Sequence, residues 1–259
     1  MNVLDLFAGI GGFSFAAHRL GWKTKAFCEQ NNYCTKVLKK NFPNVPIYPD
    51  VRRIEDFTKY AGTINVICGG YPCQPFSQAG KQEGERDDRH LWPAMFEIIQ
   101  KIRPNWVIAE NVIGHISMGL DSVLSDLESE GYTTQSIVIP ACAVFAIHRR
   151  ERVWVISHNK SKRQKRPKVK VCTDKIRALG TKQPRGLGNS SDRERRGFYF
   201  ESNILRTHDG VPIELDRTVT VPNRAERVQA LGNAIHPEVA FQIFRRINLI
   251  EYGYCIKNL

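Results

Sequence analysis

A cysteine between prolines is the residue of this sequence whose setting most suggests chemistry. Cys73 lies in the segment Cys-Gly-Gly-Tyr-Pro-Cys-Gln-Pro-Phe-Ser-Gln-Ala-Gly at 68–80. Because each proline fixes its own φ angle, the backbone aims the thiol. The segment follows an apolar run at 64–67 that predicts a buried strand, and open α/β sheets carry their chemistry at such strand ends. The pattern indicates a nucleophile, although a buried structural cysteine in a turn fits it as well.

A carboxylate and two arginines could act beside Cys73. Glu110 follows a second apolar run at 105–109, so its side chain lies near the Cys73 loop if the two predicted strands are neighbours. Arg150 and Arg152 stand two positions apart, and on an extended chain such side chains project to the same side. The pair would suit a planar or anionic group, or a solvent-facing ion-pair patch with Glu151.

The elements that must position these residues begin with a glycine turn. An alternating run at 2–7 leads into Gly9-Ile-Gly-Gly12, and an apolar helix is predicted at 13–20, ending at Gly21. Strand, glycine turn and helix open a nucleotide-binding α/β unit, because the glycines allow close approach and the helix offers free N–H groups. The Gly-x-Gly-Gly spacing does not favour a dinucleotide.

Two acidic residues follow the next predicted strands. Glu29 comes directly after the strand at 22–28, where folds of this kind bind ribose hydroxyls. Asp50 follows a short third strand and could accept a hydrogen bond from an adenine amino group. A helix N-cap or turn aspartate would have the same local sequence.

The remaining pattern predicts an α/β fold. Helices are expected at 91–103, at 119–131 and from Pro237 onward, and strands at 133–139 and 153–157. At 259 residues the chain is long enough for one large domain with a modest insertion.

A basic segment interrupts this pattern. Between 160 and 227 there are eighteen Lys and Arg against eight Asp and Glu, so this stretch carries ten of the twelve net positive charges. We therefore predict a catalytic and cofactor-binding domain at 1–157 plus 223–259, and a small loop-rich insertion at 158–222. The charge suggests a polyanion, with nucleic acid first, although a basic surface that only keeps the protein soluble would look similar.

Composition argues against several other classes. Seven cysteines without a Cys-x-x-Cys pair suggest neither a disulfide framework nor a metal site. No signal peptide precedes the first strand pattern, and no apolar run is long enough to span a bilayer. We expect a cytosolic protein with reduced thiols.

Five of these segments, in order, resemble the motifs of the DNA cytosine-5 methyltransferases. The resemblance covers nearly the whole chain outside the insertion. It departs from the family at His148, where glutamine is usual, and in the insertion, which at about 65 residues is short for a target-recognition domain. The matching segments are Asp5-Leu-Phe-Ala-Gly-Ile-Gly-Gly12, Tyr71-Pro-Cys-Gln-Pro-Phe-Ser77, Glu110-Asn-Val112, Arg150-Glu-Arg152 and Gly232-Asn-Ala-Ile-His-Pro237.

The resemblance implies a Rossmann-like S-adenosylmethionine-dependent methyltransferase fold and a specific reaction. A methyl group would pass to carbon 5 of a flipped-out cytosine in duplex DNA, at a short specific sequence. Cys73 would add to carbon 6 and Glu110 would hold or protonate ring N3. Arg150 would bind the cytosine O2 with support from Arg152, and the polar, glycine-rich loop at 77–89 would close over the base.

The resemblance and the charge pattern also suggest binding residues. Those expected to contact S-adenosylmethionine are Asp5, Phe7, Ala8, Gly9, Gly11, Gly12, Glu29, Gln30, Asp50, Val51, Pro72, Leu91, Asn233 and Ile235. Those expected to contact DNA are Gln74, Ser77, Lys162, Arg163, Lys165, Arg166, Arg193, Arg195 and Arg196.

The expected partner is double-stranded DNA, not a membrane. A monomer that acts with a cognate restriction endonuclease is a further expectation, as is a cytoplasmic, nucleoid-associated protein of prokaryotic or phage origin. A tRNA cytosine-5 methyltransferase and a non-catalytic DNA-binding protein on the same scaffold are alternatives. The intact set of Cys73, Glu110 and Arg150 argues against the second, and the glycine spacing disfavours a Rossmann oxidoreductase.

Overall fold

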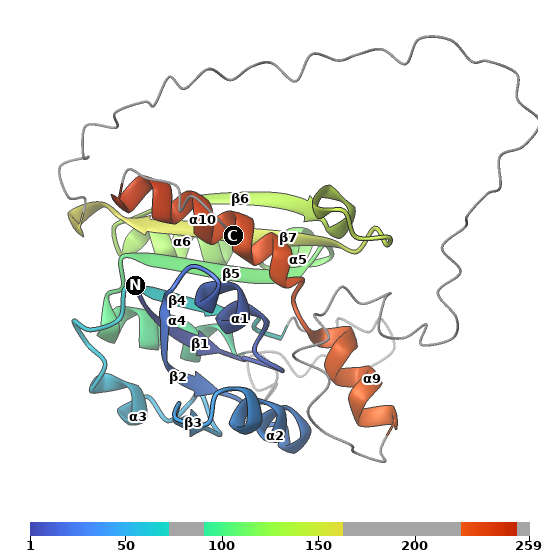
Figure 1. Ribbon diagram of the computed structural model, residues 1–259. Coiled ribbons are helices and arrows are strands. Elements are labelled where there is room, and N and C mark those ends of the chain that lie inside the picture. The colour runs from blue at the N-terminus through green and yellow to red at the C-terminus, as the bar shows by residue number, and fades with distance from the viewer. Residues whose placement is uncertain (73–90, 163–223, 253–259) are drawn as a thin grey trace, which may run out of the picture.

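One seven-stranded sheet forms the centre of the molecule (Figure 1). The structure is a computed structural model that describes residues 1–72, 91–162 and 224–252. The strand order is β3-β2-β1-β4-β5-β7-β6. The strands are β1 (Asn2–Leu6), β2 (Lys23–Cys28), β3 (Ile47–Tyr48), β4 (Val66–Gly69), β5 (Trp106–Val112), β6 (Tyr132–Pro140) and β7 (Glu151–Asn159).

The strands from β3 to β5 run parallel, and β7 lies antiparallel between β5 and β6. The order of the strands along the chain reverses between β1 and β4, and in open α/β sheets ligands bind at the carboxyl ends next to such a point. The predicted α/β fold of the Rossmann-like methyltransferase type is confirmed. The part of the chain that the structure describes contains no helix long and apolar enough to cross a bilayer.

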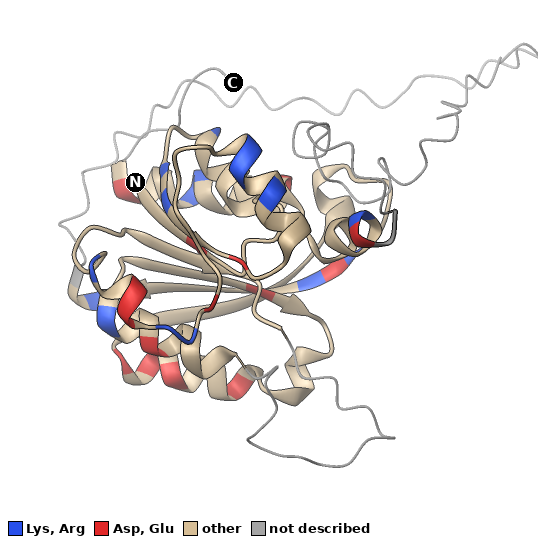
Figure 2. Ribbon diagram, turned by 90° about the horizontal axis from the view of Figure 1, so that it is seen from below, with Lys and Arg blue, Asp and Glu red and all other residues tan. Residues whose placement is uncertain are grey.

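Helices cover both faces of the sheet, and Figure 2 shows that most acidic residues on helices lie below it in that view. One face carries α4 (Trp92–Ile102) and α6 (Leu120–Ser129), and the other α1 (Gly12–His18) and α10 (Pro237–Tyr252). The other helical elements are α2 (Asn32–Asn41), α3 (Glu55–Thr58), α5 (His115–Met118), α9 (Arg224–Asn233), η1 (Ala141–Val144) and η2 (Lys160–Lys162).

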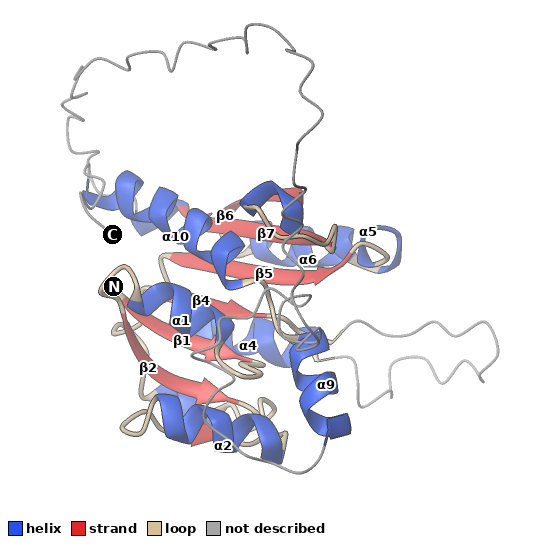
Figure 3. Cartoon of the chain, turned by 45° about the vertical axis from the view of Figure 1, so that its right-hand side comes forward, coloured by secondary structure: helices blue, strands red, loops and turns tan. Residues whose placement is uncertain are grey.

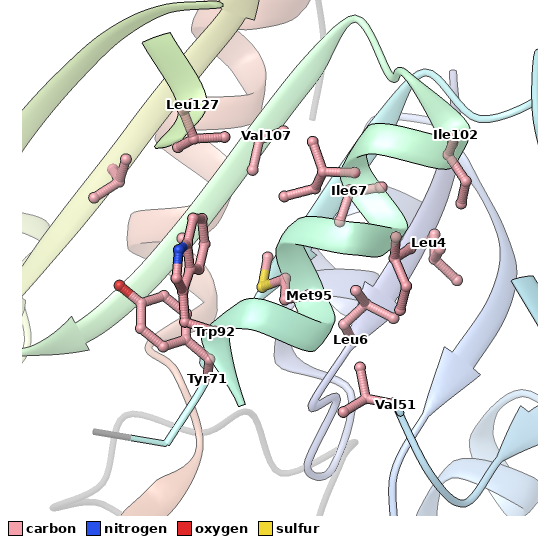
Figure 4. Close-up of a cluster of buried hydrophobic side chains, with 14 of the residues drawn as sticks. Leu4, Leu6, Val51, Ile67, Tyr71, Trp92, Met95, Ile102, Val107 and Leu127 are labelled. Carbon is pink, nitrogen blue, oxygen red and sulfur yellow. The ribbon is translucent and has the colours of Figure 1, made fainter. Parts of the chain in front are cut away.

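The core has two main parts because successive side chains of a strand point to opposite faces. On β1, Leu4 and Leu6 join Met95 of α4 on one face (Figure 4). Val3 joins Phe13 of α1 on the other face, in a cluster that includes α10. All five residues are buried. This burial on both faces explains why the parallel strands appear in the sequence as continuous apolar runs.

Three polar contacts join α10 to the N-terminal half of the chain. Arg19 forms an ion pair with Glu238 at 2.5 Å. The indole nitrogens of Trp22 and Trp106 donate to Asn248 at 3.1 Å and to Glu251 at 2.7 Å. The helix predicted from Pro237 is therefore fixed against α1, β2 and β5.

Most predicted elements occur within a few residues of their expected bounds. The helix expected at 119–131 is α6, and the strands expected at 133–139 and 153–157 are β6 and β7. The short helices α3 and α5 were not predicted, because four residues are too few to show a helical period. The predicted loop at 77–89, and all of the predicted insertion after Lys162, lie outside the described residues.

Candidate active site at the carboxyl edge of the sheet

A cavity of about 740 Å³ opens at the carboxyl edge of the parallel strands. Its wall includes the residues that follow β1, β2, β3 and β4, the end of β5, and the end of α9. A volume of this size suits a nucleotide-sized ligand. A second hollow of about 820 Å³ lies between α10 and the β6–β7 pair, away from these strand ends. Among the residues lining the cavity are Phe7, Gly9, Glu29, Gln30, Asp50, Val51, Pro72, Leu91, Glu110, Asn111, Val112, Arg152, Gln229, Ala230, Gly232 and Asn233.

The glycine turn after β1 brings backbone to the wall of this cavity. Gly9 has φ 55°, in the left-handed region, and its N–H faces the end of β2. Gly12 begins α1, and a Cβ atom there would lie 2.8 Å from Cγ1 of Ile235. A side chain at position 12 would therefore displace the chain segment that follows α9.

Asp5 stabilises this turn through hydrogen bonds to Ser14 of α1. The side chain is fully buried, and it accepts hydrogen bonds from the backbone nitrogen of Ser14 at 3.2 Å and from its hydroxyl at 2.7 Å. Burial raises the pKa of Asp5 to about 7. Asp5 does not line the cavity, so it holds the start of α1 in place.

Glu29 presents its carboxylate to the cavity with both oxygens already in use. One oxygen accepts from the backbone nitrogen of Gly9 and the other from that of Asn31, each at 2.7 Å. Because a carboxylate oxygen can accept two hydrogen bonds, each still has room for a hydroxyl donor. The two backbone bonds fix the carboxylate in position for such a ligand.

Asp50 has a partner of its own at the cavity wall. The guanidinium of Arg52 lies 3.0 Å from one oxygen and 3.1 Å from the other, and the backbone nitrogen of Arg52 also donates to Asp50. These bonds hold the pKa of Asp50 below its usual range. This geometry is compatible with both predictions for Asp50, a structural aspartate in a turn and an acceptor for an adenine amino group.

The carboxylate of Glu110 lies at the end of β5 and meets Arg152 of β7. Nε of Arg152 is 3.1 Å from Oε1 of Glu110, and only 8% of Glu110 is exposed. Burial raises the pKa of Glu110 to about 7, although Arg152 and Arg150 oppose the shift. A carboxyl group with such a pKa can hold or release a proton near neutral pH.

Arg150 takes a different direction from Arg152. Its φ is 28°, so the chain is not extended there, and Nη2 donates to the carbonyl oxygens of Gly232 at 2.8 Å and Ala234 at 2.7 Å. Glu151, between the two arginines, forms an ion pair with the exposed Arg149 at 2.7 Å. The two arginines therefore contact different parts of the site.

The residue before Pro72 is held from three sides. The hydroxyl of Tyr71 lies 2.7 Å from Nε2 of His115, and the side chain of Asn111 donates to the Tyr71 carbonyl at 3.1 Å. The rings of Tyr71 and Trp92 lie side by side, with centroids 5.1 Å apart (Figure 4). These contacts fix the course of the chain as it leaves β4 toward Pro72.

Comparison with known proteins assigns the chain to a family. The model of the C-5 cytosine-specific DNA methylases matches residues 1–204. The chain belongs to this family. It is 36% identical over 169 residues to the type II methyltransferase M2.BsuMI of Bacillus subtilis, and the alignment covers 61% of this chain and 42% of that protein. It is 33% identical over 165 residues to the type II methyltransferase M.HpaII of Haemophilus parainfluenzae, and the alignment covers 61% of this chain and 46% of that protein. The aligned part thus spans less than half of either relative.

Solved structures share the fold of this chain. The S. pombe Dnmt2 methyltransferase superposes with a TM-score of 0.68 at 16% identity, covering 98% of this chain and 100% of that one. A putative DNA modification methyltransferase encoded within an E. coli prophage superposes with a TM-score of 0.53 at 28% identity, covering 62% of this chain and 47% of that one. The first likeness, at its low identity, concerns the fold alone.

The structure brings together many of the residues that the sequence predicted for the site. The nine predicted cofactor residues that line the cavity are Phe7, Gly9, Glu29, Gln30, Asp50, Val51, Pro72, Leu91 and Asn233. Asp5, Ala8, Gly11, Gly12 and Ile235 lie in the surrounding turn and core instead. Glu110 and Arg152 also line the cavity.

Other predicted residues cannot be placed. Cys73, Gln74 and Ser77 lie outside the described residues, as do the predicted DNA contacts from Arg163 to Arg196. Lys162 ends η2, and its side chain is not described.

Sequence reasoning missed several residues of the site. Gln229 and Ala230 of α9 line the cavity, and Tyr71 and His115 support Pro72. The sequence contained one usable signal, because Tyr71 and Asn111 both belong to segments that resemble family motifs. His115 lies in the four-residue helix α5, where no pattern marks it.

Proposed function

We propose that this chain transfers a methyl group from S-adenosylmethionine to carbon 5 of a cytosine in duplex DNA. The observation that carries the proposal is the pairing of Glu110 with Arg152 at 3.1 Å, at the wall of the same cavity that Gly9, Glu29 and Asn233 line. Pro72, which directly precedes Cys73, lies at that wall too. A proton donor and a cation thus lie together beside a nucleotide-sized site, and the candidate nucleophile is the next residue in the sequence after Pro72.

The residues of the cavity fit S-adenosylmethionine. The carboxylate of Glu29 has room for the two ribose hydroxyls, because each of its oxygens holds only one backbone N–H. Gly9 leaves its backbone open to a ligand, since it has no side chain. Asp50 would accept from the adenine amino group, and Asn233 lines the same cavity. When bound, this cofactor supplies an electrophilic methyl group.

Cys73 and Glu110 divide the chemistry of the base between them. The Cys73 thiolate adds to carbon 6, which makes carbon 5 nucleophilic, and Glu110 donates a proton to N3 so that the ring gains no full negative charge. Once carbon 5 carries the methyl group, a water molecule accepts the proton of carbon 5, and the carbon–sulfur bond breaks. Glu110 recovers the N3 proton, and Cys73 is released as the thiolate. The pKa of Glu110 near 7 suits a group that must give and regain a proton.

The two arginines have separate roles in this proposal. We assign contact with the cytosine O2 to Arg152, because its guanidinium already lies beside Glu110 at the cavity wall. Arg150 was expected to make that contact with Arg152 in support. Its bonds to the carbonyls of Gly232 and Ala234 favour a positioning role, in which it holds the wall that carries Asn233.

Substrate selection is assigned to the basic insertion at 158–222, which would contact phosphates and read the target sequence. This assignment rests on the place of the insertion in the chain, between the Arg150–Arg152 segment and the Gly232–Pro237 segment, and on its excess of Lys and Arg. Neutralising Lys162, Arg163, Lys165 and Arg166 should flatten the salt dependence of DNA binding without moving the methylated site. Exchanging the whole insertion for that of a relative should move methylation to the relative's site. Continued methylation of the original site would place recognition elsewhere.

The first test of the function is sequencing of methylated cytosines in DNA from cells that produce the protein, with Cys73→Ser as the matched control. We expect 5-methylcytosine at one short sequence in wild-type cells and none in the variant. A duplex with 5-fluorocytosine at that site should trap the wild-type enzyme covalently, because fluorine cannot leave as a proton. Trapping that persists in Cys73→Ser would contradict the role of the thiol, and the absence of new methylcytosine would contradict the function.

A further inference from the structure

Exposed apolar side chains gather at two turns beside the active site. Four belong to the connection from β5 through α5, and two to the turn between β6 and β7. The two turns lie at the same edge of the sheet, because Val112 of β5 pairs with Arg152 of β7 (Figure 3). We call these six residues the apolar rim; they are Val112, Ile113, Ile116, Met118, Phe145 and Ile147.

Phe145 is the most exposed member of the apolar rim. Its side chain is 98% exposed, and among the described residues the only other aromatic side chain with a large exposed fraction is Tyr252, at 45%. Phe145 also has φ 67°, a left-handed conformation that bulky side chains rarely adopt. A strained and fully exposed aromatic ring gains nothing in the free protein, and such residues cluster at functional sites.

The turn that carries Phe145 is anchored at its base. The backbone nitrogen of Ala141 donates to the carbonyl of Arg149 at 2.8 Å, which closes the turn, and that of Phe145 donates to Cys142 at 3.2 Å. Val144 packs against the core cluster that contains α10. The ring of Phe145 is therefore presented outward from a supported turn.

The neighbours of Phe145 favour a nucleic acid over an apolar partner. Arg149, on the same turn, has a side chain that is 80% exposed. Seven residues after Phe145, Arg152 contacts Glu110, where the proposed function places the target cytosine. A cytosine that reaches Glu110 must leave its duplex near this turn, because flipping rotates a base about its own backbone.

We propose that Phe145 enters the duplex and stacks in the space that the flipped cytosine leaves. The inference rests on the proposed function. Apolar side chains that enter between base steps are a general device of proteins that distort DNA, and an aromatic ring stacks on any base. Arg149 contacts the adjacent phosphates, and the rest of the apolar rim covers the sugars beside the opened step.

Binding of the full-length protein to a 30-base-pair duplex tests the inference, with the target cytosine either paired or mismatched. The duplex carries the site found by methylation sequencing, or a mixed sequence if none is found. Phe145→Ala should weaken binding to the paired duplex on the order of tenfold to a hundredfold. It should lose less methyl transfer on the mismatched duplex, where the base opens more readily. Phe145→Trp should keep the affinity, and DNA should quench its added fluorescence. The matched control is Ile250→Ala, which alters a 53% exposed side chain of α10.

The outcomes separate this inference from the proposed function. If the wild type neither binds nor methylates DNA, both fail; if it does both and Phe145→Ala is equally active on paired and mismatched sites, only the inference fails. Two other occupants of the surface are also tested. A melting temperature that falls by several degrees in Phe145→Ala would show that the ring packs on its own chain. A wild-type dimer that the variant converts to a monomer would show that it packs on a second copy. Either result overturns the inference.

Discussion

The guanidinium of Arg150 and the carbonyl oxygen of Gly232 are joined by a hydrogen bond of 2.8 Å, although the two residues stand 82 positions apart. Because Gly232 and its neighbour Asn233 line the cavity, this bond links the β6–β7 turn to the cavity wall. Arg150, which the family resemblance suggested as a cytosine contact, is therefore bonded to the wall that we propose for S-adenosylmethionine.

Arg150→Ala should weaken the binding of S-adenosylhomocysteine, measured by calorimetry without DNA. The expected loss is on the order of 1–3 kcal/mol, because two carbonyls lose a charged donor. Arg150→Lys should lose less, and Arg149→Ala, which alters an 80% exposed side chain, should lose nothing. Unchanged affinity together with lost methyl transfer would restore Arg150 to the base contact first expected of it.

Glu29→Gln should also weaken cofactor binding, on the order of 1–3 kcal/mol. The substitution replaces one of the two carboxylate oxygens that would accept from the ribose hydroxyls by an NH2 group, which can only donate. The same calorimetric titration measures it. Glu55→Gln is the matched control, since the Glu55 side chain is 70% exposed and lies on α3. Equal affinities in the two variants would remove Glu29 from the site.

Glu110 should make stability depend on pH. Its pKa is raised from 4.5 to about 7 in the folded protein, so the folded state keeps a proton that the unfolded chain has already lost. Relative to Glu110→Gln, the wild type should therefore lose stability as pH rises from about 4.5 through about 7, by on the order of 3 kcal/mol. Urea unfolding at several pH values measures this difference.

Asp5 titrates in the same range, but it is present in both proteins and cancels from the comparison. Glu128→Gln, at an exposed position on α6, should give no such pH dependence relative to the wild type. Parallel stability curves for wild type and Glu110→Gln would show that the carboxyl of Glu110 titrates normally.

Tyr71 and His115 should be energetically coupled. Tyr71→Phe removes a buried hydroxyl that lies 2.7 Å from Nε2 of His115, and we expect it to cost about 1 kcal/mol of unfolding free energy. His115→Leu should cost more, because it also removes the ring packed against Tyr71. The double variant should be more stable than the sum of the two losses predicts, by roughly 0.5–1.5 kcal/mol in urea unfolding. Strict additivity would mean that the contact does not stabilise the turn before Pro72.

The sequence predicted the strand-end residues well because their signals are local. Glu29 and Glu110 each follow an apolar run, and parallel strands bring such ends to one edge. The partner of Arg150 carries no comparable signal, since backbone carbonyls have no side-chain identity and Gly232 is remote in sequence. The positive φ of Arg150 also breaks the extended geometry assumed for the arginine pair. The exposure of Phe145 depends on how its turn is folded, which no periodicity reveals.

The attachment of α10 has a consequence for how the protein can be assembled. Within the described residues, all seven strands lie between 1 and 159, while Asn233 and α10 follow the basic insertion in the sequence. The contacts of α10 with Arg19, Trp22 and Trp106 are made by side chains and do not depend on chain connectivity. We therefore expect that two fragments, produced by cutting the chain within the insertion, would recombine through these contacts. Recovery of cofactor binding after mixing would show that the two fragments have associated. If the two fragments were expressed from separate genes, DNA methylation would then require the expression of both.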